Sequence, residues 1–135
     1  MDLIEQNLSS LLIAAFVAWI VWKRFVAPKL AGVKKISAAE YIKMSTQPHT
    51  LLDVRQDAEW ARGHAAEAIH IPLGEVVQRS DEIPVGQPVV VICASGNRSA
   101  MAATKLAKLG FASTYNFTGG MSAWGGAQLP VKRSA

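Results

Sequence analysis

Four consecutive β-branched residues, Val89 to Ile92, are the sequence feature that most restricts the fold of this chain. A short apolar run of this kind predicts a strand buried on both faces, as in parallel sheets. The run leads directly into Cys93, the only cysteine. Residues 98–109 then show apolar side chains at helical spacing, and Gly110 stands at a helix C-cap position. Cys93 is therefore expected at the carboxyl end of a strand, where ligands bind in open α/β sheets.

The loop that follows Cys93 has features of an anion-binding turn. Gly96 can adopt the positive φ that a tight curl around the sulfur requires. Amides of the loop and of the first helical turn, together with the Arg98 guanidinium, would lower the pKa of Cys93. Such a thiolate suits sulfur transfer through a persulfide or phosphoryl transfer through a phosphocysteine. The alternative is an inert cysteine, because unpaired cysteines are often simply buried.

The spacing between cysteine and arginine separates the two chemistries. The pattern is Cys-x4-Arg, and the loop closely resembles the active-site loop of the rhodanese family of sulfurtransferases. Cysteine-dependent phosphatases use a loop one residue longer, because a phosphoryl group is bulkier than one sulfur atom. The resemblance implies a persulfide on Cys93. It also implies a binding loop made of Ala94, Ser95, Gly96, Asn97, Arg98 and Ser99.

Other segments resemble rhodanese domains in the same order along the chain. They are Leu-Leu-Asp53-Val-Arg55, Glu59-Trp60, Gly63-His64, Ala68-Ile-His-Ile-Pro72, Gly119-Gly120-Met-Ser-Ala-Trp124 and Leu129-Pro-Val. The resemblance covers Ile36 to Val131 and departs at Glu67, where the family commonly has glycine. It implies a doubly wound parallel sheet flanked by helices.

Six residues outside the loop have expected roles. Asp53 and Arg55 are expected to support the loop as a structural ion pair or hydrogen-bond network. Histidine is a common general base, but sulfur transfer from an ionised thiolate needs no base, so we expect a structural role for His64. Trp124 is expected in the core, and Gly119-Gly120 either beside the pocket or simply in a turn.

Strand and helix signals alternate along the rest of the chain, which independently predicts an α/β fold with a parallel sheet. Strands are predicted over residues 51–54, 68–71, 89–92 and 113–117, and helices over 37–44, 59–62, 73–79, 98–109 and 120–124. Ser37 and Glu40 form a capping box at the first of these helices. Asp57 is the predicted cap of the second helix.

An uncharged segment, Leu8–Trp22, precedes the globular part. We interpret residues 8–26 as an uncleaved transmembrane anchor, with Trp19 and Trp22 in the interfacial region. The alternatives are a cleaved signal peptide, which the acidic start disfavours, and a buried helix of a soluble protein. The predicted division is a tail over 1–7, the anchor, a basic linker over 27–35, a domain over 36–131 and a tail over 132–135.

The nearby basic residues all follow the uncharged segment Leu8–Trp22: Lys23, Arg24, Lys29, Lys34 and Lys35. The positive-inside rule then predicts a single-pass protein of the inner (cytoplasmic) membrane, with its carboxyl domain in the cytoplasm. One cysteine fits a reducing compartment. Charges nearly balance from Ile36 onward, so the pI of 9.5 reflects this cluster and no nucleic-acid partner is expected.

These features predict a sulfurtransferase that moves sulfane sulfur from thiosulfate or a persulfide donor, small molecule or protein, to a thiol or cyanide. Its expected partners also include the lipid bilayer, and no cofactor and no metal ion are expected. Thiosulfate is expected to be a modest donor, since Arg98 is the only charged residue of the loop. One alternative is a non-catalytic, membrane-tethered module of the same fold. Another is a phosphatase or arsenate reductase, which the short loop and the lack of a second cysteine disfavour.

Overall fold

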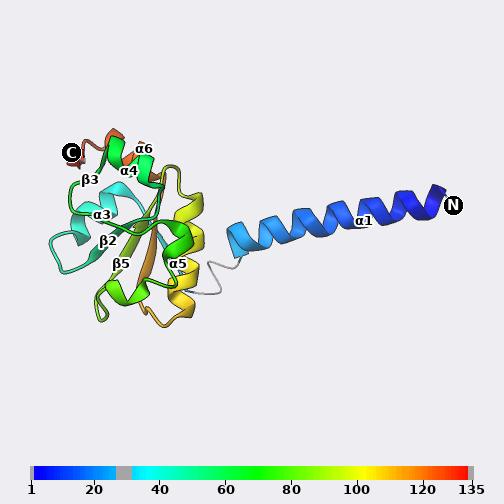
Figure 1. Ribbon diagram of the computed structural model, residues 1–135, viewed down its shortest axis with the longest axis horizontal. Coiled ribbons are helices and arrows are strands. Elements are labelled where there is room, and N and C mark those ends of the chain that lie inside the picture. The colour runs from blue at the N-terminus through cyan, green and yellow to red at the C-terminus, as the bar shows by residue number, and fades with distance from the viewer. Residues whose placement is uncertain (1, 27–31, 134–135) are drawn as a thin grey trace.

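A computed structural model describes residues 2–26 and 32–133 of the chain. A long helix, α1 (Asp2–Val21), continues into a π-helical turn, η1 (Trp22–Val26). Figure 1 shows α1 projecting from an α/β domain that contains the remaining elements. The predicted tail over residues 1–7 is helical from Asp2 onward, so α1 begins earlier than the predicted anchor.

The domain is organised around a five-stranded sheet with the order β1-β6-β5-β2-β4, in which all neighbouring strands are parallel. The strands are β1 (Lys34–Ile36), β2 (Thr50–Asp53), β4 (Ile69–His70), β5 (Val89–Ile92) and β6 (Thr114–Phe117). β5 lies at the centre, and all four of its residues are buried. The prediction of a buried parallel strand ahead of Cys93 is therefore confirmed.

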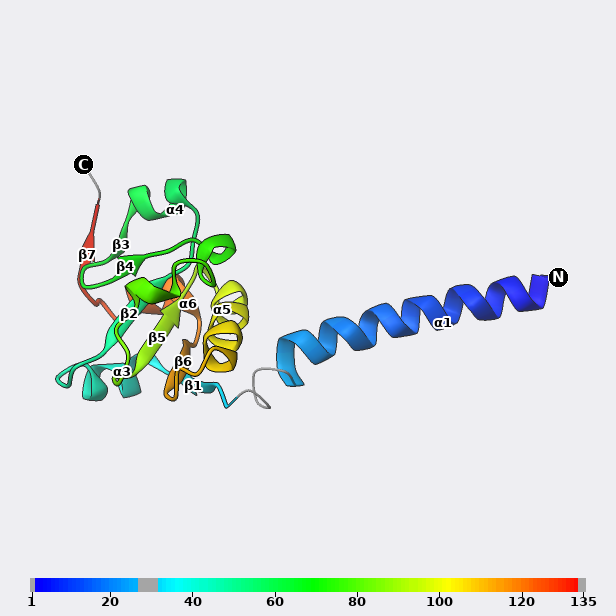
Figure 2. The ribbon, with the colours of Figure 1, turned by 60° about the horizontal axis from the view of Figure 1, so that its bottom comes forward.

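Helices cover both faces of the sheet, which confirms the predicted doubly wound α/β fold (Figure 2). They are α3 (Ala38–Met44), α4 (Asp57–Arg62), α5 (Asn97–Lys108) and α6 (Gly120–Gly126). Side chains of β5 alternate between two cores, as the pleat requires. Val89 and Val91 pack with Leu106 of α5, whereas Val90 packs on the opposite face with Tyr41 of α3 and Trp124 of α6.

The predicted capping box of α3 is present. Glu40 N donates to Ser37 Oγ (3.2 Å), and Ser37 N donates to Glu40 Oε1 (3.0 Å). The predicted cap of α4 is wrong, because Gln56 occupies the N-cap and Asp57 is the first helical residue. Gln56 N donates to the Glu59 carboxylate (3.1 Å), which satisfies an amide at the start of α4.

Residues 73–79 do not form the predicted helix. They contain only the 3₁₀ turn η2 (Leu73–Glu75), and a second turn, η3 (Ser80–Glu82), follows. Gly74 and the neighbouring valines Val76 and Val77 have low helix propensity, and tertiary packing buries Val76 completely while leaving Val77 about half exposed.

Three strands were not predicted. β1 spans the boundary between the predicted linker and the predicted domain, and linker residues 27–31 are outside the described part of the chain. Ile36 is its one buried residue, so β1 has no alternating pattern to detect. β3 (His64–Ala65) and β7 (Val131–Lys132) form a separate antiparallel pair of two residues each. Strands this short are defined by their partners and not by periodicity.

One helical segment among the described residues, Leu3–Val26, is long and apolar enough to cross a membrane. An 18-residue window within it has a mean hydropathy of 1.6 and contains no buried residue. The 20 residues of α1 span about 30 Å, which matches the hydrocarbon thickness of a bilayer. The Lys23 ammonium lies 5.0 Å from the centre of the Trp19 ring. The segment is a candidate membrane anchor, although a signal sequence near an N-terminus has the same length and composition.

Candidate active site

Cys93 follows the last residue of β5, and α5 begins four residues later. Figure 2 shows α5 beside β5, on the side of the domain that faces α1. Gly96 has φ +105°, which confirms the predicted left-handed turn. In this conformation Gly96 N donates a hydrogen bond to Cys93 Sγ (3.0 Å). The chain therefore curls around the sulfur and directs a backbone amide at it.

The surroundings of Cys93 favour its thiolate. The residue is 1% exposed, and its Sγ lies 3.3 Å from Ser99 Oγ. Burial raises the pKa of Cys93, whereas hydrogen bonds from the Ser99 hydroxyl and from the amides of Ser99, Gly96 and Ser95 lower it. The hydrogen bonds outweigh burial, so the pKa lies below the ordinary value of a thiol. A buried thiol whose anion is stabilised by hydrogen-bond donors is a candidate nucleophile.

Asn116 is a site residue that the sequence analysis missed. It comes from β6, and its Nδ2 donates to Gly96 O (3.1 Å). Its Oδ1 is an acceptor within reach of Ser99 Oγ, whose single proton goes either to this oxygen or to Cys93 Sγ. One side chain thus contacts both ends of the loop. The pairing of Val91 with Asn116 in the parallel sheet brings it there. A residue that strand register brings to Ser99, 17 positions earlier in the chain, has no local sequence signal.

Arg98 lies elsewhere than expected. Its guanidinium forms a two-point pair with the Glu59 carboxylate of α4, with Nη1–Oε1 at 2.6 Å and Nη2–Oε2 at 2.9 Å. The Arg98 hydrogen bond lowers the pKa of Glu59 to about 2. Glu59 therefore balances much of the Arg98 charge, although Arg98 still interacts electrostatically with Cys93. The hydrogen bonds to Sγ that the structure describes involve backbone amides and the Ser99 hydroxyl.

Asp53 and Arg55 form the expected ion pair. Arg55 Nη2 lies 2.8 Å from Asp53 Oδ2, and the two side chains are 8% and 0% exposed. Arg55 N also donates to Asp53 Oδ1 (2.9 Å), and Nη2 donates to Gly63 O (2.7 Å). The pair joins the end of β2 to the residue that follows α4.

His64 and Trp124 have structural surroundings. The His64 ring stacks on Trp60 with centroids 3.5 Å apart, and Nδ1 lies 3.0 Å from Trp60 O. Trp124 is 3% exposed and donates from Nε1 to Pro130 O (3.0 Å). The expectation that Trp124 belongs to the core is confirmed.

The start of α6 packs against the backbone of Cys93. Met121 N donates to Cys93 O (2.8 Å). Gly120 has φ +56°, and a Cβ at this position would overlap Cys93 O and the Ala94 carbonyl. The glycine pair therefore lies beside the loop, and Gly120 is required there both by its φ and by the close approach of two backbones.

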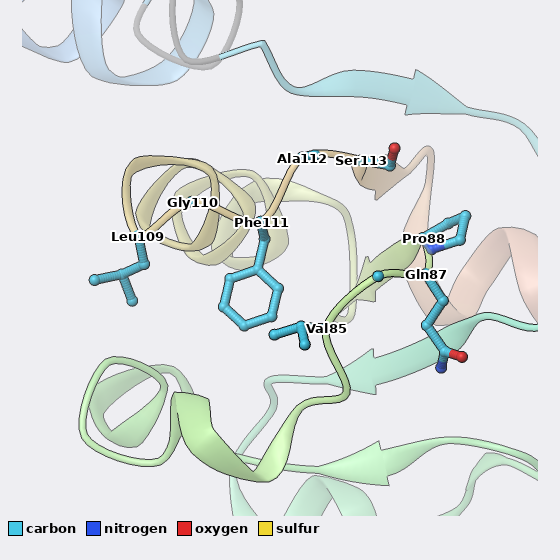
Figure 3. Close-up of a pocket in the computed structure, with 9 residues that line it drawn as sticks. Val85, Gln87, Pro88, Leu109, Gly110, Phe111, Ala112 and Ser113 are labelled. Atoms are coloured by element: carbon cyan, nitrogen blue, oxygen red, sulfur yellow. The ribbon is translucent and has the colours of Figure 1, made fainter.

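A separate cavity lies at the opposite end of β5. Figure 3 shows its lining, which includes Val85, Pro88, Leu109 and Phe111. The cavity has a volume of about 280 Å³. Pro88 directly precedes β5 and Cys93 directly follows it, so this cavity is distinct from the cysteine site. Among residues 2–26 and 32–133, no cluster of His, Cys, Asp or Glu has a metal-binding arrangement.

Comparison with known proteins gives one family. The profile of the rhodanese-like domain matches residues 37–127. A thiosulfate sulfurtransferase, GlpE of Vibrio cholerae, is 34% identical over 99 residues, which cover 73% of this chain and 92% of GlpE. The uncharacterized protein YqhL of Bacillus subtilis is 32% identical over 86% of this chain and 90% of YqhL. The putative sulfur carrier protein YrkF of the same organism is 40% identical over 82 residues, but the match spans only 44% of YrkF.

Solved structures show the same fold. A rhodanese-related protein of Thermoplasma volcanium superposes with a TM-score of 0.68 at 33% identity and covers 75% of this chain and 99% of its own. A rhodanese-like domain protein of Staphylococcus aureus has a TM-score of 0.68 at 28% identity, with 76% and 100% covered. The α/β domain accounts for these matches, and α1 lies outside the family profile.

Proposed function

Because the chain belongs to the rhodanese-like domain family, we propose that it transfers sulfane sulfur through a persulfide on Cys93. The observation that carries the proposal is the environment of the Cys93 thiol. Gly96 N donates a hydrogen bond to Sγ, and the pKa of Cys93 is lowered although the side chain is buried. The relatives named as sulfurtransferases support the same reaction class.

The proposed reaction has two steps. The Cys93 thiolate attacks the outer sulfur of thiosulfate, the S–S bond of thiosulfate breaks, and sulfite leaves with the bonding electrons. Cys93 then carries a persulfide, whose terminal charge the loop amides of residues 94–99 stabilise. A thiol or cyanide attacks the terminal sulfur, and the Cys93 thiolate leaves. With cyanide the product is thiocyanate, and the enzyme returns to its starting state.

Each loop residue has a proposed part in this cycle. Gly96 and Ser99 act through donors to the sulfur, and Ser95 acts through its amide. Gly120 packs against the backbone of Ala94. Asn97 is the first residue of α5. Arg98 joins the loop to α4 through Glu59, and Asp53 and Arg55 support the end of β2.

Intact mass of the protein, before and after thiosulfate and then after cyanide, tests this proposal. We expect a gain of one sulfur atom that cyanide removes and that Cys93→Ser never acquires. Cysteine persulfide and glutathione persulfide are tested in parallel as donors. If none of the three donors loads the wild-type protein, the sulfurtransferase proposal is wrong, and a non-catalytic tethered module becomes the better description of the chain.

We also propose that residues 8–26 anchor the domain of residues 36–131 to the inner membrane, with the domain facing the cytoplasm. The basic residues that follow the uncharged segment Leu8–Trp22 support this orientation. Protease added to inverted membrane vesicles should digest the domain, and protease added to spheroplasts should leave it intact. The reverse pattern, or recovery of a chain shortened by cleavage after the apolar segment, would disprove the arrangement.

A further inference from the structure

A second, smaller pocket lies directly beside the loop that follows Cys93. Its volume is about 160 Å³. It is lined by parts of the chain that are far apart in sequence: the end of the candidate anchor, β1, the loop and the end of β6. The lining residues that matter here are Arg24, Lys35, Ser95, Gly96, Asn97 and Asn116. The pocket therefore shares with the thiol site the residue that donates to Sγ, Gly96.

The end of the candidate anchor is hydrogen-bonded to a residue that lines this pocket. Arg24 Nη2 donates a hydrogen bond to Asn97 Oδ1 (2.7 Å), the residue at which α5 begins. Figures 1 and 2 both show the carboxyl end of the long helical segment next to α5. The contact places a cationic residue of the anchor segment within one side-chain length of the active-site loop.

The charge of this pocket is uncompensated. Arg24 and Lys35 are its two charged residues, both are basic, and no acidic residue lines it. Within the described part of the chain, no carboxylate lies at salt-bridge distance from either. Arg98 differs, since Glu59 balances its charge. The positive charge that lines this pocket, beside the loop that follows Cys93, thus comes from residues outside the region that the family profile matches.

We propose that this pocket is an anion subsite that attracts and orients small oxyanionic sulfur donors, of the size and charge of thiosulfate, next to Cys93. The inference rests on the proposed function and adds to it two residues outside the family profile, Arg24 and Lys35, that favour anionic donors. A volume of about 160 Å³ accommodates an inorganic oxyanion but not a folded donor protein. Two cations at the mouth of a partly closed pocket raise the local concentration of anions. Added salt weakens this attraction, because mobile ions screen the two charges.

This inference reverses one sequence-based expectation. Thiosulfate was expected to be a modest donor, because the loop itself carries only the charge of Arg98. The fold adds Arg24 and Lys35 to the edge of the same loop. We therefore expect thiosulfate to be a good donor and not a modest one.

Alkylation of Cys93 provides a test that does not require turnover. Iodoacetate and iodoacetamide both alkylate a thiolate and release iodide, and they are nearly equal in size, but only iodoacetate is an anion. The rates are measured on the full-length protein in neutral detergent, so that anionic lipid headgroups do not compete. The variants are Arg24→Gln, Lys35→Gln and the two together. Lys108→Gln, which removes one exposed charge at the far end of α5, is the matched control.

We expect the double variant to lower the ratio of the iodoacetate rate to the iodoacetamide rate about tenfold at low salt. The iodoacetamide rate should change less than twofold, and Lys108→Gln should leave both rates unchanged. Arg24→Lys keeps the charge, so its ratio of the iodoacetate rate to the iodoacetamide rate should stay close to that of the wild type. The KM for thiosulfate should rise about tenfold in the double variant, with little change in kcat.

The outcomes separate this inference from the proposed function. If thiosulfate loads Cys93 but the double variant changes neither the ratio nor the KM, the subsite is wrong and the sulfurtransferase stands. If the ratio falls as expected but no donor forms a persulfide, the subsite stands and the sulfurtransferase is wrong. A fall in both alkylation rates together would indicate a distorted loop and would also overturn the subsite.

Discussion

Glu59 and Arg98 join α4 to the active-site loop through two hydrogen bonds, of 2.6 and 2.9 Å. Their side chains are 25% and 34% exposed, so the pair is partly shielded from water. The arginine of the Cys-x4-Arg pattern therefore has a structural partner 39 positions earlier in the chain. Its contribution to the site is to hold the first turn of α5 against α4.

Glu59→Gln should destabilise the domain by about 1 kcal/mol at neutral pH, because a partly exposed ion pair contributes little more. The pKa of Glu59 falls from 4.5 to about 2 on folding, so the carboxylate stabilises the fold fully above about pH 4.5. That stabilisation is lost as the pH falls toward 2. Urea unfolding of both proteins from pH 7 to pH 2 measures the difference, which should shrink with acid.

Glu67→Gln is the control for this series, since Glu67 is exposed and has no ion pair among the described residues. It should unfold like the wild type at each pH. A Glu59→Gln difference that is the same at pH 2 and pH 7 would contradict the role assigned to the carboxylate.

Ser99→Ala should raise the pKa of Cys93. The Ser99 hydroxyl lies 3.3 Å from Sγ, and its hydrogen bond stabilises the thiolate. The rate of iodoacetamide alkylation as a function of pH gives the thiol pKa, whose midpoint should lie below 9.0 in the wild type and move upward in the variant. Thr104→Ala removes a hydroxyl of the same helix that bonds only to Ala100 O, and it should leave the midpoint in place. Equal midpoints in Ser99→Ala and the wild type would show that amides alone set the thiol pKa.

Gly120→Ala should lower the free energy of unfolding by at least about 2 kcal/mol. The added Cβ would overlap the backbone of Cys93 and Ala94, and the residue has a φ of +56°. The substitution should also slow alkylation of Cys93, since the loop must shift to make room. Gly125→Ala, in the same helix with open space around it, should be neutral or slightly stabilising. Chemical denaturation of the two variants measures the contrast, and similar stabilities would refute the close packing of α6 on the loop.

Asp53→Asn should destabilise the domain by about 3–5 kcal/mol, because it leaves the buried Arg55 guanidinium without its counter-charge. Asp57→Asn, whose side chain is 92% exposed, should change stability by less than about 0.5 kcal/mol. Thermal or urea unfolding compares the two. If the two variants are equally stable, the Asp53–Arg55 pair does not stabilise the domain.

The central features of the site could be predicted from sequence because they are local. The β-branched run of β5, the glycine turn and the helical spacing of α5 each depend on residues within one short stretch. Their order places Cys93 at a strand end in any parallel sheet. The resemblance of successive motifs to rhodanese domains supplied the fold class for the same reason, since each motif is a local pattern.

Only the tertiary structure could assign partners to these local elements. Arg98 binds Glu59, and Asn116 reaches Gly96 and Ser99, because strand order and register bring distant residues together. β1 is a strand only because its backbone pairs with β6. The charge beside the thiol likewise depends on Arg24 packing against α5. Sequence spacing thus predicts the nucleophile and its loop. The electrostatic surroundings of the thiol are instead made by non-local contacts. The strength of these contacts depends on distances that exist only in the folded chain.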